Sequence, residues 1–147
     1  MLLADHSTSP TGHFHLEVFR DGVLVDVVDE SNIIVNLSKT ILAELVGGTV
    51  SGNSITKFGI GTNGSSPLPG NTTLTNSYSN SVASVSYPSA GVVSFGFGIS
   101  SAEAVGMQIL EFGLLTDAGR LFARKVRAVA LNKTTDISFN GSWVITF

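Results

Sequence analysis

The sequence contains no cysteine among its 147 residues. Disulfide bonds, thiolate metal sites and cysteine nucleophiles are therefore excluded, and the hydrophobic core alone must hold the fold together. Charged residues are also scarce, at 13% of the chain against 43% hydrophobic residues. A disordered chain needs the opposite balance, so we expect a folded protein whose surface is rich in Ser, Thr, Asn and Gly. Such a surface suits a protein that works packed against neighbours.

Signals for several classes of function are also missing. The net charge is −3, and only Arg124, Lys125 and Arg127 bring basic residues close together, so no footprint for nucleic acid is visible. The first residues lack the basic region and the long apolar stretch of a signal peptide, and no later run is long enough to span a membrane. We therefore expect a soluble protein whose partners include neither nucleic acid nor a membrane.

The length of the chain fits a single domain, residues 1–147, and local signals divide it into three stretches. We expect a loose segment at residues 1–12, a hairpin and a helix at residues 13–48, and the main part of the fold at residues 54–147. The hairpin is indicated by Asp21-Gly22 between two apolar runs. The helix is indicated by apolar residues on one helical face, followed by two glycines that end it. The residues on that face are Ile41, Leu42, Leu45 and Val46.

From residue 54 onward, apolar residues alternate with Ser, Thr, Asn and Gly, which is the period of a half-buried strand. Turn signals separate these strands at spacings of roughly ten residues, apart from a long polar loop at residues 62–76. The predicted fold class is mainly β: an antiparallel β-sandwich with an N-terminal hairpin and one short α-helix. The expected strands of its main part cover residues 56–61, 83–87, 93–99, 107–115, 121–126 and 137–147.

Motifs for catalysis or cofactor binding fail their structural tests. The run GIGTNG at residues 59–64 spells a dinucleotide fingerprint, but Pro67 and Pro69 follow it, so no helix can begin there and offer its amides to a phosphate. His13 and His15 would project to one strand face, yet no third metal ligand is in register. No nucleophile elbow is present. We therefore predict a non-enzymatic protein without catalytic residues, cofactor or metal.

Several turn and strand motifs occur in a recognisable order. A G-x-G turn precedes a Leu-Thr-Asn box at residues 74–76, and a strand of the pattern I-x-E-x-G-L at residues 109–114 turns through D-x-G. The stretches that carry these motifs are NIIVNLSKTILAELVGG, ITKFGIGTNGSSPLPGNTTLTNSYS, MQILEFGLLTDAGRLFARKV and TDISFNGSWVITF. Over roughly residues 30–147 the order resembles the attachment domain of phage tail-collar fibre proteins, and small head or tail proteins of tailed bacteriophages. The resemblance implies a virion component without an active site.

This resemblance and the charge-poor surface lead to a specific hypothesis. We expect a non-catalytic structural protein of the virion, made in the host cytoplasm, that docks as a homo-oligomer on the tail or collar. Its partners would be its own copies and other virion proteins. The contact elements would be the N-terminal segment, the loop of residues 62–76 and the TDAG turn. The candidate contact residues are Asn63, Pro67, Pro69, Asn71, Asp117, Arg120 and Arg124.

Two alternatives remain open. The first is a capsid decoration protein. The second is a glycan-binding or receptor-binding module of the tail, in which Trp143, Tyr78 or Tyr87 would stack on a sugar. Because Trp143 is in phase with the apolar residues of its strand, core packing is favoured for it. The basic residues that follow the TDAG turn would form a patch for an acidic partner or guard the edge of their strand.

Overall fold

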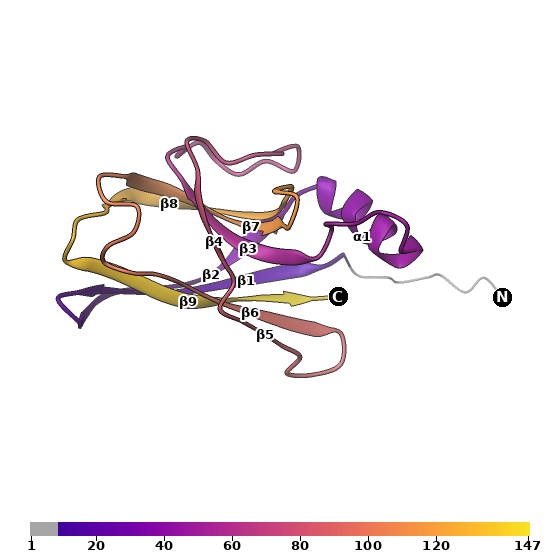
Figure 1. Cartoon of the computed structure of the whole chain (residues 1–147), viewed down its shortest axis with the longest axis horizontal. Helices are drawn as coiled ribbons and strands as arrows, with labels where there is room; N and C mark the ends of the chain where they lie inside the picture. Colours follow the sequence, from indigo (N-terminus) through magenta and orange to yellow (C-terminus); the bar gives the residue numbers. More distant parts are fainter. Residues whose placement is uncertain (1–8) are drawn as a thin grey trace.

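The computed structural model describes residues 9–147, which form a mainly β fold with one helix (Figure 1). Residues 1–8, most of the segment predicted to be loose, lie outside the described residues, whereas Thr11 and Gly12 already belong to the first strand. The elements in chain order are β1 (Thr11–Arg20), β2 (Val23–Ile34), α1 (Leu37–Gly47), β3 (Ile55–Gly61), β4 (Tyr78–Ser81), β5 (Ser84–Ser86), β6 (Val92–Ile99), β7 (Gln108–Thr116), β8 (Leu121–Asn132) and β9 (Ile137–Thr146).

The strands form one continuous curled sheet in the order β4-β3-β7-β8-β2-β1-β9-β6-β5, and every neighbouring pair is antiparallel. The predicted mainly antiparallel β fold, its N-terminal hairpin and its short helix are therefore confirmed. The sequence also predicts two separate sheets of a sandwich, and here the structure differs. The reason is β2, which runs on to Ile34 and pairs there with β8, so that the two halves of the sheet are joined.

The β1–β2 hairpin turns at the residues that the sequence indicates. Asp21 and Gly22 both have positive φ, at 49° and 78°, which is the backbone of the tight turn that matches the twist of two strands. Leu16 and Val18 of β1 are buried in the core, whereas most of β2 is exposed. The hairpin therefore contributes core residues from β1, whereas the side chains of β2 lie mostly at the surface.

Helix α1 ends where the sequence predicts, but fewer of its apolar residues face the core than the sequence predicts. Gly48 adopts φ 70° and donates its N–H to the carbonyl of Glu44 at 3.0 Å, which closes the last turn. Ile41 is fully buried, whereas Val46 is 90% exposed, so the prediction that Val46 faces the core is wrong. The helix lies at one end of the curled sheet and touches it mainly along β8, so only one side of it is covered (Figure 1).

Aromatic rings fill the space inside the curl. Phe58 and Phe97 stack with ring centroids 3.9 Å apart, and Phe14 meets Trp143 edge to face at 4.8 Å. Trp143 is fully buried, and its Nε1 donates to Oδ1 of Asn32 at 2.8 Å. The prediction that Trp143 packs in the core is therefore confirmed.

The two ends of the sheet are consecutive in the chain, because β4 and β5 are separated by only two residues. The backbone N–H of Val82 donates to Thr56 next to one end, and that of Ala83 donates to Gly96 next to the other, at 2.9 and 2.7 Å. These two residues therefore carry the chain from one half of the sheet across to the other. Beyond them, β5 is the last strand of the sheet and is exposed along its whole length.

Candidate functional site

The loop of residues 62–77, here called the polar loop, covers the outer face of β7 and β8. Beneath it, Glu111 of β7 and Arg124 of β8 are 0% and 1% exposed, and Nε of Arg124 donates to Oε2 of Glu111 at 2.7 Å. Strand alternation places these two side chains on the face opposite the core residues Phe112 and Ala123. A buried ion pair thus occupies a face that the sequence pattern marks as exposed.

The remaining polar atoms of this pair hold the loop. Oε1 of Glu111 accepts hydrogen bonds from the backbone N–H groups of Thr75, at 2.7 Å, and Asn63, at 3.2 Å. The two Nη atoms of Arg124 donate to Oδ1 of Asn71 at 3.0 Å and to the carbonyls of Asn63 and Ser65 at 3.1 and 3.2 Å. We call this arrangement the Glu111–Arg124 clamp. It satisfies both charges with loop groups and anchors the loop near both of its ends.

Glycines make room for the loop to approach the sheet. A Cβ on Gly61 would lie 2.4 Å from Oε1 of Glu111, and one on Gly113 would lie 2.9 to 3.2 Å from side-chain carbons of Leu74 and Leu121. The GIGTNG run therefore leads from β3 into the polar loop, and no helix follows it before β4. Its glycines are explained by the packing of loop on sheet rather than by a phosphate.

The candidate contact residues of the loop are divided between inner and outer positions. Pro69 is exposed and its carbonyl accepts from the N–H of Asn36 at 2.8 Å, whereas Pro67, Asn63 and Asn71 are half-buried. The side-chain oxygen of Asn71 also accepts from the N–H of Leu68 at 2.8 Å. The polar atoms of the two asparagines are thus largely used within the loop and the clamp, while the proline rings border the surface.

The TDAG turn and Arg120 join the sheet to the end of the helix. Nη1 of Arg120 donates to Oε2 of Glu44 at 2.6 Å and to Oδ1 of Asn53 at 3.0 Å. The hydrogen bonds from Arg120 and then Asn53 hold the pKa of Glu44 below its ordinary value. Asp117 is exposed, and its carbonyl accepts from Nζ of Lys57 at 2.8 Å. Arg120 therefore fixes the position of α1, and Asp117 stays at the surface.

The structure does not bring the basic residues after the TDAG turn together as a surface patch. Arg124 is inside the clamp, which corrects the expectation that its side chain meets a partner. Lys125 is paired with Glu30, and Arg127 with Asp26 at 3.1 Å, across the gap where β2 and β8 separate. We call this gap the β2–β8 seam. Its charges guard two free strand edges, as the alternative interpretation expected.

Acid and base groups of the β1–β2 hairpin lie in a row: His13 and His15 both approach Asp29, and His15 also approaches Glu17. His13 binds Asp29 across the β1–β2 hairpin, and this hydrogen bond lowers the pKa of Asp29. Among residues 9–147, no three His, Asp or Glu side chains come together in a way that would hold a metal ion. Lys133 is buried, and its Nζ donates to the carbonyl of Ser101 at 2.9 Å, while its burial lowers its pKa. Lys133 lines neither the gap between β2 and β8 nor the larger cavity near α1.

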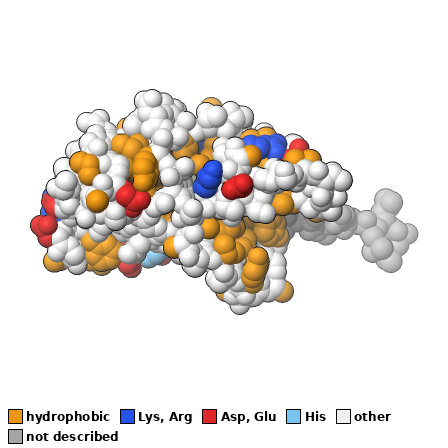
Figure 2. Space-filling model, viewed as in Figure 1, with side chains coloured by type: hydrophobic (Ala, Val, Ile, Leu, Met, Phe, Trp, Pro, Cys, Tyr) orange, Lys and Arg blue, Asp and Glu red, His pale blue; other side chains and the backbone are white. Residues whose placement is uncertain are grey.

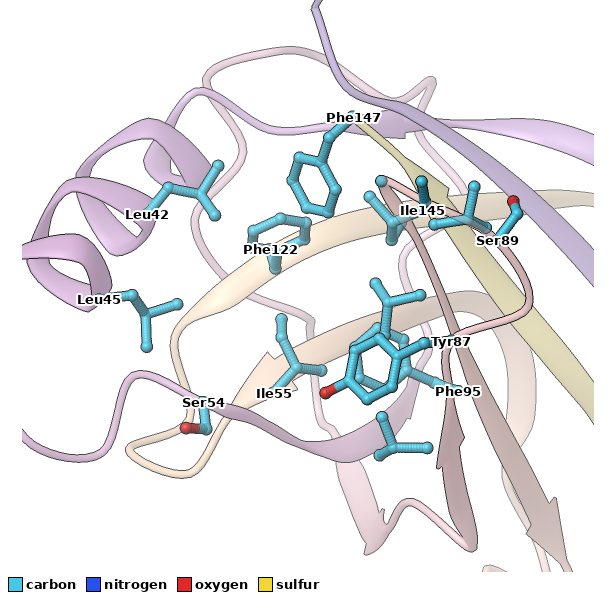
Figure 3. A pocket seen from close by; sticks show the side chains of 15 residues that line it. Leu42, Leu45, Ser54, Ile55, Tyr87, Ser89, Phe95, Phe122, Ile145 and Phe147 are labelled. Carbon is cyan, nitrogen blue, oxygen red and sulfur yellow. The ribbon is translucent and has the colours of Figure 1, made fainter.

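The larger cavity is an apolar groove of about 730 Å³ at the end of the sheet near α1 (Figure 3). Leu42 and Leu45 of the helix lie on one side of the groove and Tyr87 lies on the other, and Val85 also lines it. The remaining lining residues are Ser54, Ile55, Ser89, Ala90, Gly91, Val92, Val93, Phe95, Phe122, Ile145 and Phe147. We call this cavity the apolar groove. None of the residues between 9 and 147 that line it is charged.

Sequence reasoning missed the groove, although one signal for it exists. Residues 58–102, from the middle of β3 to beyond β6, contain no Asp, Glu, Lys or Arg. This run supplies one wall of the groove, and the lobe over β5 and β6 shows only apolar and uncharged polar side chains (Figure 2). Phe147 is 50% exposed although it is in phase with the buried Trp143 and Ile145 of β9. Tyr87, one residue after β5, is 78% exposed and is in phase with Val85, which is 44% exposed. The alternation therefore continues past the core and into the groove.

Within residues 9–147, no helix is long and apolar enough to cross a membrane.

Comparisons with known proteins do not assign the chain to a family. No family model, no curated protein and no solved structure matches the sequence or the fold. The resemblance to tail-collar fibre attachment domains accordingly stays a prediction from the motifs.

Proposed function

We propose that this chain is a non-catalytic structural protein of a tailed bacteriophage virion that docks as an oligomer on the tail or collar. The observation that carries the proposal is the apolar groove of about 730 Å³, whose lining residues in the described part of the chain carry no charge. In the same proposal, the two halves of the curled sheet act as the two layers of a sandwich that presents this groove at one end.

The chemistry of the groove supports a protein partner. Its walls are aliphatic and aromatic side chains from α1, β3, β6, β8 and β9 and from the chain around β5, so it offers no charge or metal ligand for a reaction. Exposed apolar surface of this kind costs free energy in water and marks interaction sites in soluble proteins. A hydrophobic side chain or strand from a virion neighbour would bury it.

The rigidity of the surrounding structure also supports docking. The polar loop is fixed by the Glu111–Arg124 clamp, and the helix wall of the groove is fixed by Arg120 through Glu44 and Asn53. A binding surface held in one conformation loses little conformational entropy when a partner arrives. These buried and half-buried charges have structural partners, which leaves them no evident catalytic task.

The two alternative functions differ from the proposal in what the protein would bind: another site on the particle, or a sugar. Capsid decoration uses the same kind of surface and differs only in the site on the particle. For the glycan-binding alternative, Trp143 is buried and bonded to Asn32, so it offers no face to a sugar. Tyr87 remains exposed at the wall of the groove and is the aromatic side chain that this alternative would need.

The proposal is tested by binding the purified chain to tails and to emptied heads, prepared separately from the phage that encodes it. We expect saturable co-sedimentation with tails. Leu45→Glu places a carboxylate in the groove and should weaken binding at least about tenfold, because the charge would be buried without a partner. Val46→Glu is the matched control, since Val46 is the next residue, is 90% exposed and does not line the groove.

Each other result would contradict the tail assignment in a defined way. Binding to heads alone would replace it with capsid decoration. Binding to neither particle would refute a structural role in the virion, and a glycan array with specific hits would then favour the receptor-binding alternative. Equal binding by the Leu45→Glu and Val46→Glu variants would show that the groove is not the docking site.

A further inference from the structure

Among residues 9–147, strand edges lack a backbone partner in three places: in the β2–β8 seam and along the outer edges of the two end strands, β4 and β5. At β4, the carboxylate of Glu103 accepts from Tyr78 and Asn80, so a charged group flanks that edge. In the β2–β8 seam, Asp26, Glu30, Lys125 and Arg127 cross the gap as ion pairs. At β5, the last strand of the sheet, every residue is exposed and no charged side chain lies within residues 58–102. Soluble proteins usually protect free edges with charges, so an edge without them is suited to pairing with another strand.

From this contrast we infer that β5 and the adjoining rim of the apolar groove bind a second copy of the same chain. The two copies would pair their β5 strands antiparallel about a two-fold axis beside Val85. The inference rests on the proposed function, for which it names the surface of self-association. Val85 and Tyr87, 44% and 78% exposed, would then be covered by the other copy.

Charge complementarity identifies the occupant. A partner strand with Lys, Arg, Asp or Glu would bury these charges against a surface that offers no counter-charge, which is unfavourable. The partner is therefore expected to be an extended segment without charged side chains. The β5 strand and its flanks, Val82 to Tyr87, have this composition themselves. Pairing about a two-fold axis at Val85 also sets Ser84 of one copy opposite Ser86 of the other, so small hydroxyl side chains meet.

Position supports the same occupant. Val85 lies in the edge strand β5 and also lines the groove. Tyr87, one residue after β5, lines the groove as well (Figure 3). A second copy that extends the sheet at β5 therefore brings its own Val85 and Tyr87 next to the apolar surface of the first. Backbone hydrogen bonds and apolar burial would then act at one continuous site.

The first experiment measures molecular mass against concentration by sedimentation equilibrium. We expect a dimer for the natural chain and a dissociation constant at least about tenfold higher for Ser86→Lys, which puts a guarding charge on the edge without lining the groove. Thr72→Lys is the control: Thr72 is exposed in the same uncharged run but lies in the polar loop. A natural chain that stays monomeric, or a Ser86→Lys variant that dimerises as tightly, would overturn the inference.

The absence of natural cysteine allows a second, geometric experiment. Pairing centred on Val85 brings the two Cβ atoms to about 4.5–5.5 Å, close enough for a disulfide after a small adjustment. Mild oxidation should therefore link two copies of the Val85→Cys variant and leave the Thr72→Cys variant as single chains. Equal linking of the two variants would contradict pairing at β5.

These results separate the inference from the proposed function. A monomer that still binds tails would overturn self-association through β5 and preserve the virion role. A dimer that depends on Ser86 but binds neither tails nor heads would preserve self-association through β5 and overturn the virion role.

Discussion

The polar loop and the β5–β6 hairpin lie close together in the sequence, in one run without charged residues, yet they are held in opposite ways. The polar loop is tied to the sheet by Glu111 and Arg124, which other strands supply. Strand β5 of the hairpin, by contrast, has backbone partners on one side only, and its other side is a free edge beside the groove.

The difference shows how a chain with few charges distributes them. Two of its charged side chains are buried under the polar loop, where each bonds to several loop groups. Others cross the β2–β8 seam, and none lies in residues 58–102. The polar loop is thus packed against the sheet, whereas β5 of the β5–β6 hairpin, which also lacks charged residues, is left exposed. The exposed segment is therefore the better candidate for partner binding, and substitutions in the two segments should have different consequences.

The largest effect is expected from Arg124→Met, which keeps the length of the side chain but removes its charge. Glu111 would then be buried without its cation, and the carbonyls of Asn63 and Ser65 would lose their donors. Breaking a buried pair in this way typically costs about 3–5 kcal/mol of the free energy of unfolding. Urea denaturation, followed by the fluorescence of Trp143, measures the loss.

Arg20→Met is the matched control for that variant. Arg20 pairs with Asp136, but its side chain is 56% exposed, so water replaces the lost partner and little stability should disappear. If the two variants lose the same stability, the clamp is no more important than an exposed ion pair, and the contrast between loop and hairpin fails.

A smaller effect is expected from Gly61→Ala. The new methyl group would lie 2.4 Å from Oε1 of Glu111 and 2.8 Å from the carbonyl of Thr75, so the loop would have to move away from the sheet. Overpacking of this kind typically costs about 1–3 kcal/mol. Gly70→Ala in the same loop is the control, because no atom lies within 4 Å of its Cβ position. Equal midpoints of urea denaturation for the two variants would contradict close packing beneath the loop.

Much of the strand and helix pattern could be predicted because its signals are local. Asp21-Gly22 specifies a turn, Gly48 ends a helix, and the alternation in residues 137–145 defines a buried strand face. The joining of the two halves of the sheet through Ile33 and Ile34 could not be predicted, because pairing between β2 and β8 involves residues about 90 apart, which no local pattern reports.

The position of Arg124 shows the same limit at the candidate site. Its place in the alternation of β8 correctly indicates the face opposite the core, and that face is usually exposed. Here the polar loop, distant in the sequence, covers it. The groove was missed for the converse reason: Tyr87 and Phe147 continue the apolar alternation of their strands, but no further layer covers them. Periodicity reports which face a residue shares, and it does not report what lies on that face.

The pH dependence of stability offers a prediction at the border between the two segments. Glu103, the first charged residue after the uncharged run, accepts from the N–H of Ser100 and from Tyr78 and Asn80 of β4. The backbone bond from Ser100 foremost, and after it the bond from Tyr78, lower the pKa of Glu103 below its ordinary value of 4.5. Its contribution is therefore fully present above pH 4.5 and is lost as the pH falls through the lower pKa of the folded state.

We accordingly expect Glu103→Gln to flatten the acid limb of the stability curve. Between pH 5 and pH 3, roughly the range over which carboxylates titrate, the natural chain should lose more stability than the variant. Urea midpoints measured at several pH values give both slopes. Parallel slopes would show that the bonds from β4 and Ser100 do not favour the ionised form of Glu103.

The smallest effect on stability is expected from Tyr87→Ser, at the exposed segment. Tyr87 is 78% exposed, so its removal should change the free energy of unfolding by only about 0.5 kcal/mol or less. The same substitution removes a large apolar surface from the wall of the groove, so binding of a fluorescent hydrophobic dye to the monomer should fall clearly. A loss of stability as large as that of Arg124→Met, with unchanged dye binding, would mean that Tyr87 is part of the core. The segment around β5 and the polar loop would then contribute equally to the stability of the fold.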